Sequence, residues 1–143
     1  MQQATYEDAG LILRLYELRR EEKLRTARAW FTGTFSAKSL EEMMAQCTPG
    51  SDENAYFRMV TTYWEMAASF VVQGVLNEGL YIQSGGEGLF VFEKVRPFLE
   101  GLREAYKNPL LLKNLETVAD IQVDWMNENA PGAYEAMLER IRG

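Results

Sequence analysis

The chain of 143 residues contains no histidine, a single cysteine and no long apolar run, and each absence excludes a class of function. Without histidine, no imidazole can activate a serine or cysteine nucleophile or bind a metal ion. Cys47 has no partner for an internal disulfide, as is typical of proteins from reducing compartments. Because no run of about 18 apolar residues is present, the sequence predicts no transmembrane helix. We therefore expect a cytoplasmic protein without a metal site or a cofactor.

Positive charge is also scarce, since 15 Lys and Arg stand against 21 Asp and Glu and give a net charge of −6. This balance argues against nucleic acid, whose binding depends on neutralising phosphates with basic side chains. The charge is uneven along the chain. Residues 1–35 hold six basic and five acidic side chains (+1), whereas residues 36–143 hold nine and sixteen (−7).

The segment of residues 54–76 predicts a central helix that is buried on several sides. Its apolar residues recur every three or four positions and form two neighbouring stripes. A helix that is apolar over most of its girth packs against neighbours on more than one side. Ser51 or Asp52 is expected to cap its first turn, and Gly74 to mark its exit. The first stripe comprises Phe57, Val60, Trp64, Ala67 and Val71, and the second Tyr56, Met59, Tyr63, Met66 and Phe70.

The remaining periodicity is also helical, and no segment alternates between apolar and polar residues as a strand would. We expect helices over residues 6–31, a short one after Ser39, one over 89–106, one from Asn108-Pro109 to about 128, and a short final one. Pro97 predicts a kink or a break near Arg96. The sequence therefore predicts an all-α, single-domain bundle of about six helices, comprising residues 1–143.

The first of these helices has a basic side, which is a candidate surface for a protein partner. Two interpretations remain open: the side docks on an acidic partner or an anionic membrane surface, or it is a solvated face with pairs such as Glu21–Arg25. The candidate partner surface comprises Arg14, Arg19, Arg20, Lys23 and Arg28, together with Trp30 and Phe31 at the end of the helix.

The central helix also carries a polar stripe, in which Arg58, Thr62 and Glu65 are the candidate residues. In one interpretation they line a pocket beside the helix of residues 89–106 and bind a small ligand. In the other they are a solvated edge, or Arg58 and Glu65 pair with neighbouring charges such as Arg96.

Acidic residues recur every four positions at Glu116, Asp120, Asp124 and Glu128. Steps of four residues drift around a helix, so these carboxylates do not converge on one metal ion. We interpret them as a solvated acidic edge, or as an edge that faces the basic first helix in the same chain or in a second copy.

Four stretches of the sequence resemble an uncharacterised bacterial helical family, known as a domain of unknown function. They are Tyr63-Trp64-Glu65, the segment from Gly74 to Gly79, the segment from Phe92 to Phe98, and the stretch from Arg103 to Leu115. The resemblance covers roughly residues 55–120. Many members of that family carry an N-terminal transmembrane segment, which the sequence does not predict here. The resemblance implies a helical fold and supplies no activity and no catalytic residues.

Three functional hypotheses follow. The first is a non-enzymatic cytoplasmic protein that acts through protein–protein contacts, either with another protein or with a second copy as a homodimer. The second is a small-ligand-binding bundle that uses Arg58, Thr62 and Glu65. The third, an enzyme without histidine, requires two carboxylates that converge in a cleft, and the sequence shows no such pair.

Overall fold

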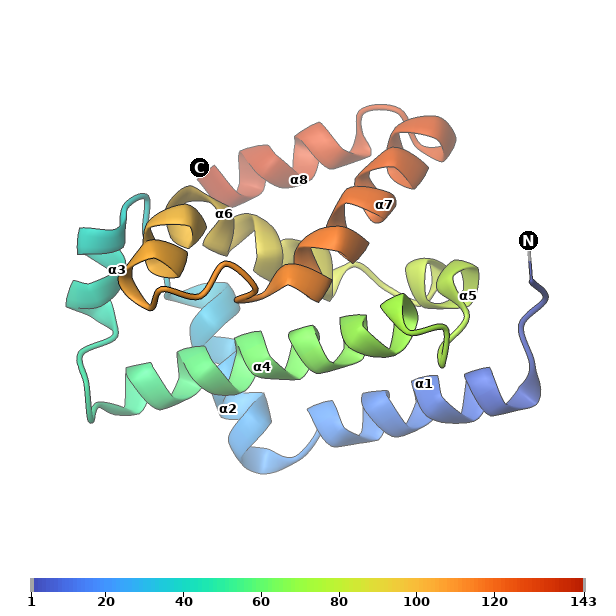
Figure 1. Cartoon of the computed structure of the whole chain (residues 1–143), viewed down its shortest axis with the longest axis horizontal. Coiled ribbons are helices and arrows are strands. Elements are labelled where there is room, and N and C mark those ends of the chain that lie inside the picture. The colour runs from blue at the N-terminus through green and yellow to red at the C-terminus, as the bar shows by residue number, and fades with distance from the viewer. Residues whose placement is uncertain (1, 143) are drawn as a thin grey trace.

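The computed structural model describes residues 2–142, and within them it contains eight α-helices and no strand (Figure 1). The predicted all-α class is confirmed, and the helices pack around one hydrophobic core. The eight helices among residues 2–142 exceed the predicted number of about six. The helices are α1 (Tyr6–Arg19), α2 (Glu22–Gly33), α3 (Leu40–Gln46), α4 (Asp52–Val72), α5 (Glu78–Gln83), α6 (Glu87–Ala105), α7 (Lys113–Asn129) and α8 (Ala133–Arg142).

The helix α4 crosses the centre of the molecule and contacts α2, α5, α6 and α7 (Figure 1). The hydroxyl of Ser51 accepts a hydrogen bond from the Asn54 backbone N–H at 3.1 Å, as the capping prediction requires. All five residues of the first predicted stripe are buried. The helix ends earlier than predicted because Gly74, at a φ of +77°, turns the chain away.

An aromatic cluster fills the core between α2, α4 and α6. The ring centroids of Phe31 and Phe35 are 5.2 Å apart, and that of Phe57 lies 6.0 Å from Phe31. Phe98 of α6 completes the cluster at 6.0 Å from Phe35. Because each buried ring removes a large apolar area from water, this cluster contributes strongly to the stability of the bundle.

The predicted first helix of residues 6–31 is two helices, α1 and α2, and this prediction is corrected. The chain breaks at Glu21, whose backbone is extended with a ψ of 140°. The carboxylate of Glu21 accepts a hydrogen bond from the Leu24 N–H at 3.0 Å and so caps α2. The break allows α2 to turn from the direction of α1 and to pack against α4 (Figure 1).

Two predictions about α6 and α7 are also corrected. The helix α6 continues through Pro97, so of the kink or break predicted near Arg96 the break does not occur. Asn108 caps a turn rather than a helix, since its side-chain oxygen accepts from the Leu110 N–H at 3.0 Å. Leu112 then adopts a left-handed conformation with a φ of 56°, and α7 begins only after it.

Candidate functional site

The helix α1 lies along one edge of the molecule and packs against the bundle with one face only (Figure 1). Asp8 and Leu15 are its buried residues. The Asp8 carboxylate accepts hydrogen bonds from the backbone N–H groups of Thr5 and Asn77, each at 2.8 Å. These two bonds lower the pKa of Asp8 below its usual value. The Leu15 carbonyl accepts a hydrogen bond from the Tyr63 hydroxyl.

The side of α1 turned away from Asp8 and Leu15 carries exposed apolar side chains, of which Tyr16 also borders a small hollow beside α4 and α5. Tyr6, Leu13 and Tyr16 are 98%, 62% and 51% exposed, and Ala9 is exposed between them. Their spacing of three, four and three residues places them in one row along the helix. We call Tyr6, Ala9, Leu13 and Tyr16 the outer stripe. The sequence analysis did not identify the outer stripe, although its spacing is readable in the sequence.

The basic residues of the candidate partner surface do not share one environment. Arg14, Arg20 and Lys23 are exposed. Arg19 is half-buried, with its guanidinium carbon 4.8 Å from the centre of the Tyr16 ring. The structure therefore leaves three basic side chains of this set open to solvent near the C-terminal end of α1.

Arg28 is engaged within the chain rather than presented to a partner. Two of its nitrogens donate to the two carboxylate oxygens of Glu87, each at 2.6 Å. This bidentate pair raises the pKa of Arg28 and joins α2 to the first turn of α6. Glu87 also places negative charge at that helix terminus, where an anion would otherwise be favoured.

The Trp30–Phe31 end of the predicted surface is part of the core, and this prediction is corrected for Phe31. Phe31 is fully buried. Trp30 is partly buried and packs against Phe35 and Tyr56, with ring centroids 5.2 and 6.0 Å away. The separate helix α2 turns both rings toward α4.

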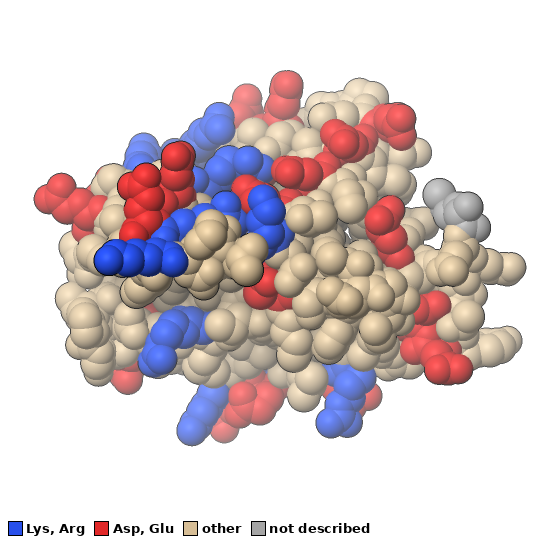
Figure 2. Space-filling view, viewed as in Figure 1, with Lys and Arg blue, Asp and Glu red and all other residues tan. Residues whose placement is uncertain are grey.

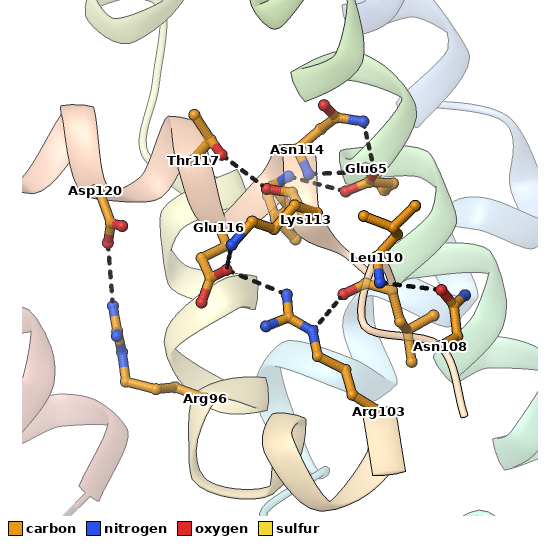
Figure 3. A network of polar contacts seen from close by, with 12 residues as sticks. Glu65, Arg96, Arg103, Asn108, Leu110, Lys113, Asn114, Glu116, Thr117 and Asp120 are labelled. Atoms are coloured by element: carbon orange, nitrogen blue, oxygen red, sulfur yellow. Dashed lines mark hydrogen bonds and ion pairs between the residues drawn. The ribbon is translucent and has the colours of Figure 1, made fainter. Parts of the chain in front are cut away.

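The polar stripe of α4 does not line a common pocket. Arg58 and Thr62 are exposed, and the Thr62 hydroxyl donates to the Arg58 carbonyl at 2.5 Å. The Glu65 carboxylate instead accepts from the Leu115 N–H and from the Asn114 side-chain amide, each at 2.8 Å (Figure 3). Glu65 therefore caps α7, since the first N–H groups of a helix have no partner within it. Four hollows, beside α2, between α1 and α4, between α6 and α8, and near the N-terminus, are lined by residues other than Arg58, Thr62 and Glu65.

Glu116 and Asp120 of the acidic edge of α7 face α6 and not α1 within the same chain, which corrects the expectation that this edge faces the first helix of the same chain. Glu116 accepts from Arg103 at 3.2 Å and from Lys113 at 3.0 Å, and Asp120 lies 4.0 Å from Arg96 (Figure 3). On the molecular face shown in Figure 2, Lys and Arg are interspersed with Asp and Glu on the left and along the lower edge, while the upper right carries acidic side chains. The edge is thus partly neutralised inside the monomer.

Cys47 behaves as a small buried apolar residue, as expected from its position. It is 3% exposed. Burial, and secondarily the charge of Glu53, raise the pKa of the thiol to about 11. The thiol is therefore protonated near neutral pH and is a poor nucleophile.

Among the helices of residues 2–142, none combines the length and the apolar character needed to cross a bilayer.

These features define an all-helical bundle with an apolar stripe on a peripheral helix and with its one cysteine buried in the core. The family model described as a domain of unknown function (DUF4760) matches residues 4–125, so the chain belongs to this family. The predicted family resemblance is confirmed, and the match extends beyond residues 55–120 to include α1. Comparisons with curated proteins and with solved structures found no match.

Proposed function

We propose that this is a non-enzymatic, cytoplasmic bacterial protein that acts through protein–protein contacts made by the outer stripe of α1. The observation that carries the proposal is the exposure of Tyr6, Leu13 and Tyr16 in one row of a helix. Isolated exposed apolar residues are ordinary, but a contiguous row on one element is typical of an interaction site. The exposed Arg20, which is the C-cap of α1, lies at the end of this row and contributes to its selectivity.

The partner we propose is a second copy of the chain, with the two α1 helices antiparallel. Among the exposed charges of α1 and its C-cap, the N-terminal half carries Glu7, whereas the C-terminal part carries Arg14, Glu17 and Arg20 and is net positive. Antiparallel pairing brings the acidic half of one copy opposite the basic half of the other, while parallel pairing opposes like charges. Helix dipoles favour the same orientation.

One antiparallel register uses the whole outer stripe. In it, Tyr6 lies opposite Tyr16 of the second copy, and Ala9 lies opposite Leu13 of the second copy. The large rings at the ends and the small alanine beside leucine fill the contact in four layers, as in helix pairs with heptad spacing. Since the row runs from Tyr6 to Tyr16 and a helix rises about 1.5 Å per residue, the contact is about 15 Å long. So short a contact buries less area than a permanent interface, and we expect a weak, concentration-dependent dimer.

Light scattering coupled to size exclusion, from micromolar to near-millimolar protein, tests self-association. We expect a mass that rises with concentration and that persists at high salt, because the contact is apolar and salt screens only its charges. Leu13→Glu should keep the protein monomeric at every concentration. Leu110→Glu is the matched control, since Leu110 is 70% exposed outside α1 and should leave the dimer unchanged.

A cross-linking experiment tests the orientation separately. Under mild oxidation, a mixture of the Ala9→Cys and Leu13→Cys proteins should form the mixed disulfide faster than either protein pairs with itself. Cys47 is buried and does not compete. Faster self-pairing of each variant would show a parallel dimer. A strict monomer in light scattering, with no cross-link in either case, would contradict self-association.

A further inference from the structure

A hollow of about 290 Å³ lies between the segment after α2, the middle of α6 and the end of α8. The side chains that line it include four cations and one carboxylate, in a chain whose net charge is −6. The cations come from three different elements, so the fold and not one helix periodicity brings them together. The charged lining residues are Lys38, Lys94, Arg96, Arg142 and Glu93.

The one carboxylate of this hollow, that of Glu93, accepts hydrogen bonds from Arg96 and Tyr134 within the chain. Glu93 is 5% exposed and accepts from two nitrogens of Arg96, at 2.8 and 2.9 Å. The Tyr134 hydroxyl donates to it at 2.7 Å. Glu93 therefore neutralises Arg96, whereas Lys38 and Lys94 form no ion pair with any group among residues 2–142. The hollow keeps an excess of positive charge.

Lys94 is the unusual member of the set because it is only 9% exposed. Its ammonium donates to the Phe31 carbonyl at 2.8 Å and has the Thr32 carbonyl at 3.5 Å. An ammonium has three N–H donors, and besides these two carbonyls Lys94 Nζ meets the rings of Phe31, Phe35 and Phe90, with centroids 5.7, 6.0 and 5.6 Å away, but no carboxylate among residues 2–142. Burial lowers the pKa of Lys94. A buried cation without a counter-charge is costly, so an anion beside it would be favourable.

The rest of the wall is largely apolar, with Pro97 from α6 and with Leu138 and Ile141 from α8. Ligand pockets commonly combine such a wall with a few polar groups that fix the ligand, and pockets for drug-sized molecules measure roughly 300–1,000 Å³. The hollow is at the lower end of that range. We propose that it binds a small amphipathic carboxylate, with the anionic group toward Lys94 and Lys38 and the hydrocarbon part against Pro97, Leu138 and Ile141.

Calorimetric titration with octanoate tests this site on the whole chain. We expect octanoate to bind the wild type, and Lys94→Met and Lys38→Ala each to weaken it, with a loss of about tenfold or more for Lys94→Met, where the buried charge is removed. Lys23→Ala removes an exposed cation elsewhere and should leave binding unchanged. Octanamide, which has the same chain without the charge, should bind much more weakly than octanoate.

Three results would overturn the proposal. They are the absence of octanoate binding to the wild type, equal affinity of octanamide and octanoate, and wild-type affinity in both Lys94→Met and Lys38→Ala. Binding of inorganic phosphate without octanoate would also contradict it, since the apolar wall would then have no role. Lys38 is exposed, so Lys38→Ala keeps the test valid even if Lys94→Met unfolds.

Discussion

The helices α1 and α4 both have side-chain caps at their N-termini, but they differ greatly in how many of their residues are buried. Thr5 and Asp8 form a capping box at the start of α1, and Ser51 caps α4. Yet eight of the 21 residues of α4 are buried, against two of the 14 residues of α1. Local signals thus determine where a helix starts, whereas its neighbours decide which faces remain available to a partner. The apolar residues of α4 stabilise the monomer, and those of the outer stripe do not.

The largest effect that separates these two regions is expected from the aromatic core. Phe31→Ala should lower the free energy of unfolding by about 3–5 kcal/mol, because it leaves a cavity among Phe35, Phe57 and Lys94. Tyr6→Ala is the matched change in α1 and should stay within about 0.5 kcal/mol of the wild type. Urea denaturation of both variants measures the difference. If Phe31→Ala and Tyr6→Ala lower the free energy of unfolding equally, the core and the outer stripe contribute equally to the stability of the monomer, which would contradict this account.

The next effect concerns the polar stripe of α4. Glu65→Ala should cost about 1–2 kcal/mol, because the first N–H groups of α7 lose their acceptor. Arg58→Ala is a control on the same helix and, being exposed, should cost about 0.5 kcal/mol or less. If the two variants unfold at the same urea concentration, Glu65 does not cap α7.

A smaller effect is expected from Asp8, which joins α1 to the turn before α5. Because the folded state lowers the pKa of this carboxyl, Asp8 stabilises the fold above the pKa it has in the unfolded chain. This contribution disappears as the pH falls through the lowered value. Asp8→Asn should therefore be less stable than the wild type at neutral pH, and the gap should narrow in acid. A gap that stays constant between neutral and strongly acidic pH would show that the charge of Asp8 has no part in it.

The smallest change in stability is expected from the variant with the largest effect on association. Leu13→Glu replaces a side chain that is 62% exposed and should leave the unfolding transition of dilute protein within about 0.5 kcal/mol of the wild type. The same variant should abolish the dimer. A large loss of stability in dilute protein would instead mean that Leu13 supports the monomer.

The sequence was sufficient for the features that local chemistry determines. The helix starts at Ser39 and Ser51 and the buried stripe of α4 follow from residue type and spacing, and the structure confirms them. The break between α1 and α2 was not predictable in the same way. A glutamate, Glu21, caps α2 in place of the usual Ser, Thr, Asp or Asn, and the apolar periodicity continues across it.

The role of Glu65 and the position of Phe31 depend on residues far away in the chain. Glu65 caps a helix that begins about 50 residues later, and no spacing within α4 signals this. Phe31 lies at the end of a basic helix, which suggested a surface, but α2 turns it toward Phe57. The charges around Lys94 likewise come from three separate elements. Such long-range contacts require the fold, and sequence periodicity alone does not supply them.

The central claim is that the outer stripe of α1 joins two copies of the chain. Hydrogen–deuterium exchange of the wild type, at low and at near-millimolar concentration, tests it most directly. We predict that residues 6–19 become more protected as the concentration rises, while α4 stays unchanged, and that Leu13→Glu abolishes the added protection. Protection that does not depend on concentration, or that changes elsewhere while α1 stays the same, would contradict the claim.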